Sequence, residues 1–301
     1  MPPNSKARWI VKPTALSRGR GIYLVDDISD VPIDELCVVS RYIANPLLIN
    51  GLKFDIRLYV LVTSFDPLRV YLFNEGLTRF ATEQYENKDT KSRYVHLTNY
   101  SVNKKSDKFV QNSGLDKDDV GNKQSLSALN AHLEEMGVDL NLLWSRIYDV
   151  IIKALISVDH IFIPAIKKSV ANRTNCFEVF GFDILIDSDL RPWIMEVNLS
   201  PSLTCDSPLD HVIKSNLIAD TFTLVGIKKF ERKRDALHKM KNRLKSFIPS
   251  APPKNLKHES SIPGTISSNK FAAIDSVISS GPSPGSSGLG SLISRESGAA
   301  S

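Results

Sequence analysis

Two acids and an amide lie close together in residues 177–203, FEVFGFDILIDSDLRPWIMEVNLSPSL. Apolar runs at 182–186 and 192–197 flank turn-forming residues, which predicts a β-hairpin with a loop of four or five residues. Asp183 falls in the first strand and Glu196 near the end of the second, and Asn198 shares a face with Glu196. Such oxygen donors suit Mg²⁺ bound to phosphates. The pattern indicates a Mg-nucleotide site, although solvent-facing acids paired with surface cations explain the spacing equally well.

Residues 53–64 have the clearest strand pattern, because charged and apolar side chains alternate. Lys53, Asp55 and Arg57 share one face. A solvated outer face is the usual explanation of such a pattern. The alternative is the floor of a cleft, with Asp55 on a ribose hydroxyl and the two cations near phosphates.

A glycine loop, Ser17-Arg18-Gly19-Arg20-Gly21, separates predicted strands at 9–13 and 22–25. Its backbone N–H groups can cover phosphates, and Lys12 can reach one as a point charge. No GK[ST] follows, so the loop is not a P-loop, and an ordinary turn explains it as well. The apolar strand predicted at 36–43 is either a core strand or a hinge that reads an adenine edge.

The rest of the chain divides by composition. Residues 95–105 form a predicted polar loop. It is either a surface loop whose hydrogen-bonding groups are all paired or part of a site. Residues 103–123 are predicted to form a further loop. Helical periodicity covers 125–136 and 142–156, and Ser207 and Pro208 begin a helix to about 225. Residues 228–245 are a basic helical segment that is either a solvated face or a patch for an acidic polymer.

The bulk composition is that of an ordinary globular protein with a basic balance. The 301 residues carry a net charge of +5, which suggests an acidic partner. Three cysteines without CxxC spacing favour a reducing compartment. We expect no signal peptide and no membrane span.

The ordered segments WIVKP, SRGRGI, SRYIANPLLI, KFDIRLYVLVTSFDPLRVYLFNEGLTRFAT, HLTNYSVNK, FEVFGFDILID and PWIMEVNLSPSL resemble the tubulin tyrosine ligase-like family, and within it the polyglutamylases. The resemblance implies an α/β (α+β) ATP-grasp fold with antiparallel sheets and flanking helices. It also implies a ligase domain at 1–227 that lacks its N-terminal part, because only eight residues precede Trp9. A basic helical extension at 228–248 and a disordered Ser/Gly/Pro-rich tail at 249–301 would follow.

The resemblance assigns a role to each matching residue. It implies ATP and Mg²⁺ as cofactors. Arg57, Arg79 and Glu196 would be catalytic, and Asp183, Glu196 and Asn198 would hold Mg²⁺. Free glutamate would contact Arg79, Tyr100, Ser101, Lys123 and Lys214. The ATP contacts would be Lys12, Arg18, Gly19, Ser40, Arg41, Tyr42, Ile43, Lys53, Phe54, Asp55, Thr98 and Asn99.

The activity that the resemblance implies is ligation of free L-glutamate to glutamate γ-carboxylates in acidic tubulin tails, through an acyl phosphate. Arg79, Lys123 and Lys214 favour an acidic amino acid, because a second carboxylate needs its own cation. The alternatives are a glycylase and a catalytically inactive microtubule-binding fragment. We expect a monomer of the cytoplasm and cytoskeleton, including the cilium or basal body, without nucleic-acid or membrane partners.

Overall fold

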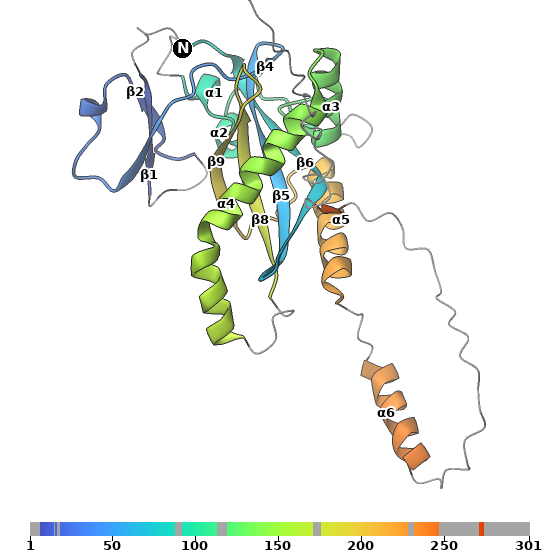
Figure 1. Cartoon of the computed structure of the whole chain (residues 1–301). Helices are drawn as coiled ribbons and strands as arrows, with labels where there is room; N and C mark the ends of the chain where they lie inside the picture. Colours follow the sequence, from blue (N-terminus) through green and yellow to red (C-terminus); the bar gives the residue numbers. More distant parts are fainter. Residues whose placement is uncertain are drawn as a thin grey trace, which may run out of the picture.

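Antiparallel strands form two sheets of different size (Figure 1). The computed structural model describes residues 7–14, 16, 19–87, 92–112, 119–170, 176–227, 232–246 and 271–273. The small sheet has the order β2-β1-β3 and contains β1 (Trp9–Pro13), β2 (Tyr23–Val25) and β3 (Cys37–Arg41). The predicted strand, glycine loop and strand at its start are confirmed, because β1 and β2 pair as a hairpin. A 3-10 turn, η1 (Ile28–Asp30), links β2 to β3.

The large sheet has seven strands in the order β10-β6-β5-β8-β9, with β4 beside β5 and β7 beside β6. The β-hairpin predicted within residues 177–203 is confirmed, because β8 and β9 pair antiparallel across a five-residue connection. The strands are β4 (Leu48–Ile49), β5 (Leu52–Phe65), β6 (Leu68–Gln84), β7 (Lys123–Ser125), β8 (Glu178–Ile186), β9 (Pro192–Leu199) and β10 (Phe271–Ala273).

Helices cover both faces of the large sheet. They are α1 (Arg93–His96), α2 (Tyr100–Asn103), α3 (Leu126–Glu135), α4 (Leu140–Ser169) and α5 (Pro208–Val225). A further helix, α6 (Arg232–Ser246), follows α5 in the chain. As predicted, Ser207 caps α5: its side chain accepts a hydrogen bond from the Asp210 N–H, and Pro208 occupies the first turn. Among the described segments, no helix has the length and apolar character that a membrane crossing requires.

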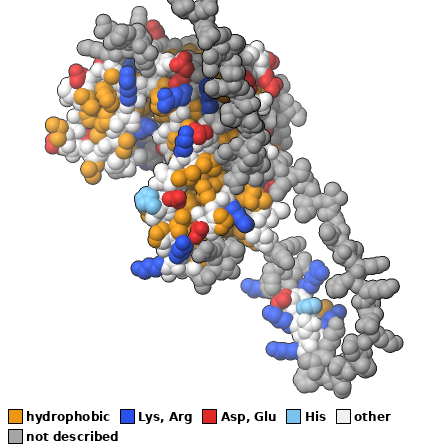
Figure 2. Space-filling model, viewed as in Figure 1, with side chains coloured by type: hydrophobic (Ala, Val, Ile, Leu, Met, Phe, Trp, Pro, Cys, Tyr) orange, Lys and Arg blue, Asp and Glu red, His pale blue; other side chains and the backbone are white. Residues whose placement is uncertain are grey.

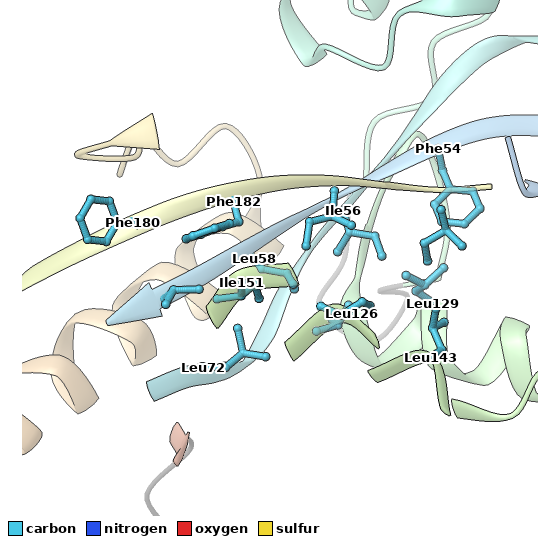
Figure 3. Close-up of a cluster of buried hydrophobic side chains, with 14 of the residues drawn as sticks. Phe54, Ile56, Leu58, Leu72, Leu126, Leu129, Leu143, Ile151, Phe180 and Phe182 are labelled. Carbon is cyan, nitrogen blue, oxygen red and sulfur yellow. The ribbon is translucent and has the colours of Figure 1, made fainter. Parts of the chain in front are cut away.

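The alternation of β5 determines which side chains enter which layer. Its even-numbered apolar residues, from Phe54 to Val62, pack with α3 and α4 in the larger core cluster (Figure 3). On the opposite face, Tyr59 and Leu61 pack with Leu209, Ile213 and Leu217 of α5. The charged residues of β5 precede Tyr59 on that same face. Helices α3 and α4 therefore cover one face of β5, and α5 covers the second half of the other face. The first half of that other face presents the charged residues.

Three sequence predictions are wrong in their extent. The stretch 95–105 is not a simple loop, because it contains α2 and the end of α1. The sequence predicts that residues 69–74 return as a hairpin strand after 53–64, but this strand, β6, does not end near Asn74 and continues to Gln84. Helix α4 extends well beyond residue 156, and Phe162 in the added part stacks on Phe65 with ring centroids 4.7 Å apart. Contacts with segments that are distant in sequence therefore extend both β6 and α4.

The C-terminal predictions are only partly within the described residues. Helix α6 agrees with the predicted basic helical segment. The predicted disordered tail lies outside the described residues except for β10, a short strand beside β6 that the sequence did not predict. The three cysteines are free thiols.

Candidate active site

A row of charged side chains crosses five neighbouring strands of the large sheet. Directly paired residues project from the same side of a sheet, and residues two apart on one strand share a face. The register pairs Lys123 with Arg79, Arg79 with Asp55, Arg57 with Asp183, and Asp183 with Glu196. We call this set the charge row: Lys123, Arg79, Asp55, Arg57, Asp183 and Glu196.

The two arginines of the charge row hold its central carboxylates. Arg57 Nη2 donates to Asp183 Oδ2 over 3.0 Å, and Arg57 Nε contacts the other oxygen. Arg79 Nη2 donates to Asp183 Oδ2 over 2.8 Å, while its Nε donates to Asp55 Oδ1 over 3.0 Å. Both aspartates are buried. The network therefore forms a largely buried set of paired charges.

Burial and pairing act in opposite directions on the pKa values of this network. Burial alone would raise the pKa of Asp183, but Arg79 and Arg57 hold that pKa at about 2. Burial alone would lower the pKa of Arg79, but Asp55 and Asp183 raise that pKa above its usual value. The charges are therefore present at neutral pH, where they can orient anionic substrates.

The predicted magnesium ligands come together at the β8–β9 edge. Asp183 lies directly across from Glu196, whose side chain is exposed, and Asn198 Nδ2 donates to Glu196 Oε1 over 3.0 Å. Two carboxylates and an amide provide oxygen donors only, which fits the preference of Mg²⁺. Within the described ranges, no group of three or more His, Cys, Asp or Glu side chains could hold a metal ion. The candidate metal site is the set Asp183, Glu196 and Asn198, on the strength of its oxygen donors.

One part of the sequence argument for that metal does not hold. From the sequence, two carboxylates that converge in an otherwise apolar hairpin are costly without a cation, which is a further argument for Mg²⁺. The structure shows that Arg57 and Arg79 already offset Asp183. The fit to Mg²⁺ therefore rests on the donor types and on the Asp183–Glu196 register, and not on an unpaired buried charge.

Lys53, near the start of β5, is buried against Tyr42 and the end of α1. Its Nζ donates to Tyr42 Oη over 3.0 Å and to the His96 carbonyl over 2.9 Å, and it lies 4.6 Å from the Tyr42 ring centre. Burial lowers the pKa of Lys53 to about 7; Asp55 opposes this and Lys12 adds to it. The predicted nucleotide residues Lys12, Tyr42, Lys53 and Asp55 therefore lie within electrostatic reach of one another.

The other predicted hinge residues have less specific positions. Ser40 and Arg41 pair with Ile10 and Trp9 in the small sheet, and Ile43 directly follows the buried Tyr42. Phe54 is 1% exposed and belongs to the core on the far face of β5. Its side chain is thus directed away from the charge row, so only its backbone is available to a nucleotide there.

The glycine loop contacts the segment that carries Thr98 and Asn99. Gly19 is buried with φ +73°, and a Cβ at this position would lie 2.7 Å from Asn99 Oδ1. Arg93 Nη2 also donates to the Gly19 carbonyl. Thr98 and Asn99 are both half-buried just before α2. The structure brings Gly19 and Asn99 together, whereas Arg18 lies outside the described residues.

The predicted glutamate-binding residues gather where β7, α2 and the start of α5 meet. Lys123 Nζ lies 4.3 Å from the Tyr100 ring centre, and Lys123 and Lys214 both pair with Asp210. Ser101 follows Tyr100 on α2 and is half-buried. Arg79 belongs to the same region through its register with Lys123. All five predicted residues thus lie around one end of the charge row.

The sequence interpretation missed three residues that support these groups. Asp210 is fully buried between two lysines, His96 accepts the Lys53 hydrogen bond through its carbonyl, and Asn103 ties α2 to β6 through Thr82. Only Asp210 has a local signal, because Ser207-x-x-Asp210 has the spacing of a capping box. The others are recognisable only from contacts between distant segments.

The chain belongs to the tubulin-tyrosine ligase family. A model described as "Tubulin-tyrosine ligase family" matches residues 2–234. This membership agrees with the antiparallel, helix-flanked architecture and shows an ATP-grasp-like ligase fold.

Individual relatives show which members of the family the chain is similar to. The chain is 53% identical to "Tubulin polyglutamylase TTLL5" of Homo sapiens over 220 residues, which are 72% of this chain and 17% of that protein. It is 44% identical to "Tubulin polyglutamylase ttll-5" of Caenorhabditis elegans over 228 residues, 75% of this chain and 31% of that protein. It is also 44% identical to "Tubulin monoglutamylase TTLL4" of Homo sapiens over 228 residues, 74% and 19% respectively. The predicted resemblance to the polyglutamylases of this family is confirmed. The chain spans less than a third of the length of these relatives.

Proposed function

We propose that this protein is an ATP-dependent tubulin polyglutamylase that joins free L-glutamate to glutamate γ-carboxylates in tubulin tails. The observation that carries the proposal is the charge row, which combines arginine, lysine and carboxylate side chains on one face of the sheet. Family membership and the names of the relatives support the same reaction. The proposal places the protein on the microtubule cytoskeleton.

The nucleotide would lie between the two sheets. Tyr42 and its neighbours would contact the adenine, Asp55 a ribose hydroxyl, and Lys12 and Lys53 the phosphates. Asp183, Glu196 and Asn198 would hold Mg²⁺, which when bound neutralises negative charge on phosphate oxygens. Arg57 is placed beside Asp183 and can stabilise the phosphoryl group as it transfers.

The reaction needs no nucleophile from the protein. A γ-carboxylate oxygen of the tail attacks the γ-phosphorus of ATP, ADP leaves, and an acyl phosphate forms. The amine of free glutamate then attacks the acyl carbon, phosphate leaves with that oxygen, and the amine loses a proton to form the isopeptide bond. The side chains position these anions and offset their charge. Such a task explains a site of paired cations and acids.

The cluster around Lys123 and Lys214 favours glutamate over glycine as the added amino acid. Both lysines are 7% exposed and lie beside Arg79 at one end of the charge row. Glycine lacks the side-chain carboxylate that would need a further cation. This arrangement therefore supports polyglutamylation over the glycylase alternative.

The surface of α6 supports an acidic acceptor. Lys and Arg side chains crowd this helix, where they far outnumber its single acid, Asp235 (Figure 2). Its described side chains are almost all exposed. A basic exposed helix attracts an acidic polymer through long-range electrostatics. We propose that this helix contacts the microtubule surface.

Mass spectrometry of tubulin tails tests the proposed function. The full chain is incubated with ATP, Mg²⁺, stabilised microtubules and either glutamate or glycine. The proposal predicts a ladder of glutamate additions, and Glu196→Gln should abolish it without unfolding the protein, because Glu196 is exposed. Glycine additions, an unmodified tail despite bound ATP, or an equally active Glu196→Gln variant would each refute it.

A further inference from the structure

Asp210 is a charged side chain without any solvent exposure, in the first turn of α5. Its Oδ2 lies 2.6 Å from Lys123 Nζ, and its Oδ1 lies 3.0 Å from Lys214 Nζ. Lys123 comes from β7 and Lys214 from the next turn of the same helix. One buried carboxylate thus joins two ammonium groups from elements about 90 residues apart in sequence.

The carboxylate of Asp210 is itself held in place by the helix start. Ser207 Oγ donates to Asp210 Oδ2 over 3.1 Å, and the Asp206 N–H donates to the same oxygen over 3.2 Å. A negative charge is also favourable at a helix N-terminus. Burial would raise the pKa of Asp210, but hydrogen bonding and attraction from Lys123, with Lys214, lower it. The carboxylate therefore remains charged and fixed.

The two ammonium groups keep donors for a further anion. Each ammonium group carries three N–H donors, and its pairing with Asp210 occupies only one of them. Lys123 also lies over the Tyr100 ring, and Lys214 donates to the Thr204 carbonyl. Both side chains remain 9% exposed. The cluster of two lysines and one aspartate has a net charge of +1, which matches a single carboxylate.

We propose that Asp210 is a positioning and specificity-determining residue that sets the geometry and net charge of a carboxylate-binding clamp formed by Lys123 and Lys214. The inference rests on the proposed function, because the carboxylate that this clamp receives belongs to the incoming glutamate. Without Asp210 the two cations would repel each other in a site that offers little water. They would then move apart or lose a proton, and either change removes the clamp.

The test compares Asp210→Asn with the wild-type full chain in the ligation assay. Asp210→Asn keeps the shape of the side chain and removes its charge. We expect the KM for glutamate to rise about tenfold or more, with kcat and the KM for ATP within about threefold, because binding of one substrate is lost. The matched control is Asp220→Asn, the same change on the same helix about 15 Å further along, which should leave all three constants unchanged.

A double variant separates this role from a merely structural one. Asp210→Asn leaves a buried cation without its partner and will lower stability. Lys214→Gln and its combination with Asp210→Asn are measured beside the single variant. Once Lys214 is gone the clamp is already lost, so adding Asp210→Asn should raise the KM for glutamate at most about threefold further, whereas general structural damage would multiply the two losses. The comparison of the double variant with Lys214→Gln keeps the test valid if Asp210→Asn alone does not fold.

The outcomes distinguish the two proposals. A wild-type chain that ligates glutamate, with Asp210→Asn retaining the wild-type KM or causing the same further loss in the Lys214→Gln background, overturns the role of Asp210 alone. Equal losses of glutamate and ATP affinity also overturn it, since they indicate general damage. A wild-type chain that neither binds nor ligates glutamate overturns the proposed function, and the assignment of Asp210 with it.

Discussion

The buried ammonium group of Lys53 should give the fold an unusual dependence on pH. In an unfolded chain the pKa of this lysine is 10.5, whereas burial in the fold lowers it to about 7. Between these values the unfolded state binds more protons than the folded state. The free energy of unfolding therefore rises with pH in this window, which is opposite to the effect of a lysine that gains an ion pair.

The size of the effect follows from the two pKa values. One pKa unit corresponds to about 1.4 kcal/mol. Below pH 7 Lys53 is protonated in both the folded and the unfolded state. Burial of its charge then lowers the free energy of unfolding by about 5 kcal/mol. Between pH 7 and pH 9 the wild-type chain should recover about 2 kcal/mol of this. Lys53→Met removes the titrating group, so the stability difference between variant and wild type should shrink by that amount.

Urea unfolding of both chains at several pH values, without nucleotide, measures this difference. Comparison with Lys53→Met cancels the titration of the other groups. A difference that shrinks by about 2 kcal/mol between pH 7 and pH 9 supports the assignment. A difference that is constant, or that grows with pH, would show that Lys53 is not held in a desolvated position.

Three further predictions concern the site and its supports. ATP binding at pH 8, measured by calorimetry in two buffers of different ionisation enthalpy, should take up a proton in the wild type and none in Lys53→Met; equal uptake by both would exclude Lys53 as the group. Gly19→Ala should weaken ATP binding about tenfold, because a Cβ would meet Asn99. Gly137→Ala is its matched control, since Gly137 also has a positive φ but open space around it. Asp187→Asn should cost about 2 kcal/mol in urea unfolding, because Asp187 accepts hydrogen bonds from the Asp189 and Arg191 N–H groups and from Trp193 Nε1; unchanged stability would contradict that role.

Local patterns predicted the elements that carry the site. The alternation along β5 identified the face that presents Lys53, Asp55 and Arg57, because a strand has a period of two. The turn residues after Ile186 identified the β8–β9 hairpin, and Ser207-Pro208 located the start of α5. Each of these signals lies within a few residues of the feature that it predicts.

Pairing between distant segments could not be predicted in this way. The alternation showed that Arg57 and Asp183 each occupy a definite strand face, but not that they meet, since 126 residues separate them. The continuation of β6 to Gln84 depends on its pairing with both β5 and β7. The helices α1 and α2 are only one turn each and have no periodicity to detect.

The functional roles of the residues depended on the resemblance rather than on spacing. Spacing left the hairpin acids equally compatible with a metal site and with solvent-facing pairs. The structure adds that Asp183 belongs to an arginine network and that Phe54 is directed into the core. These findings refine the site without needing a different reaction.

The most direct test of the account follows one oxygen atom. An acceptor peptide with the sequence of an acidic tubulin tail, labelled with ¹⁸O in its glutamate γ-carboxylates, is incubated with the full chain, ATP, Mg²⁺ and free glutamate whose carboxylates carry the same label. An acyl phosphate transfers one carboxylate oxygen to the released phosphate, so mass spectrometry should find one ¹⁸O atom in the phosphate for each glutamate added. Glutamate addition with unlabelled phosphate would contradict the mechanism, and an absence of any addition would contradict the proposed function.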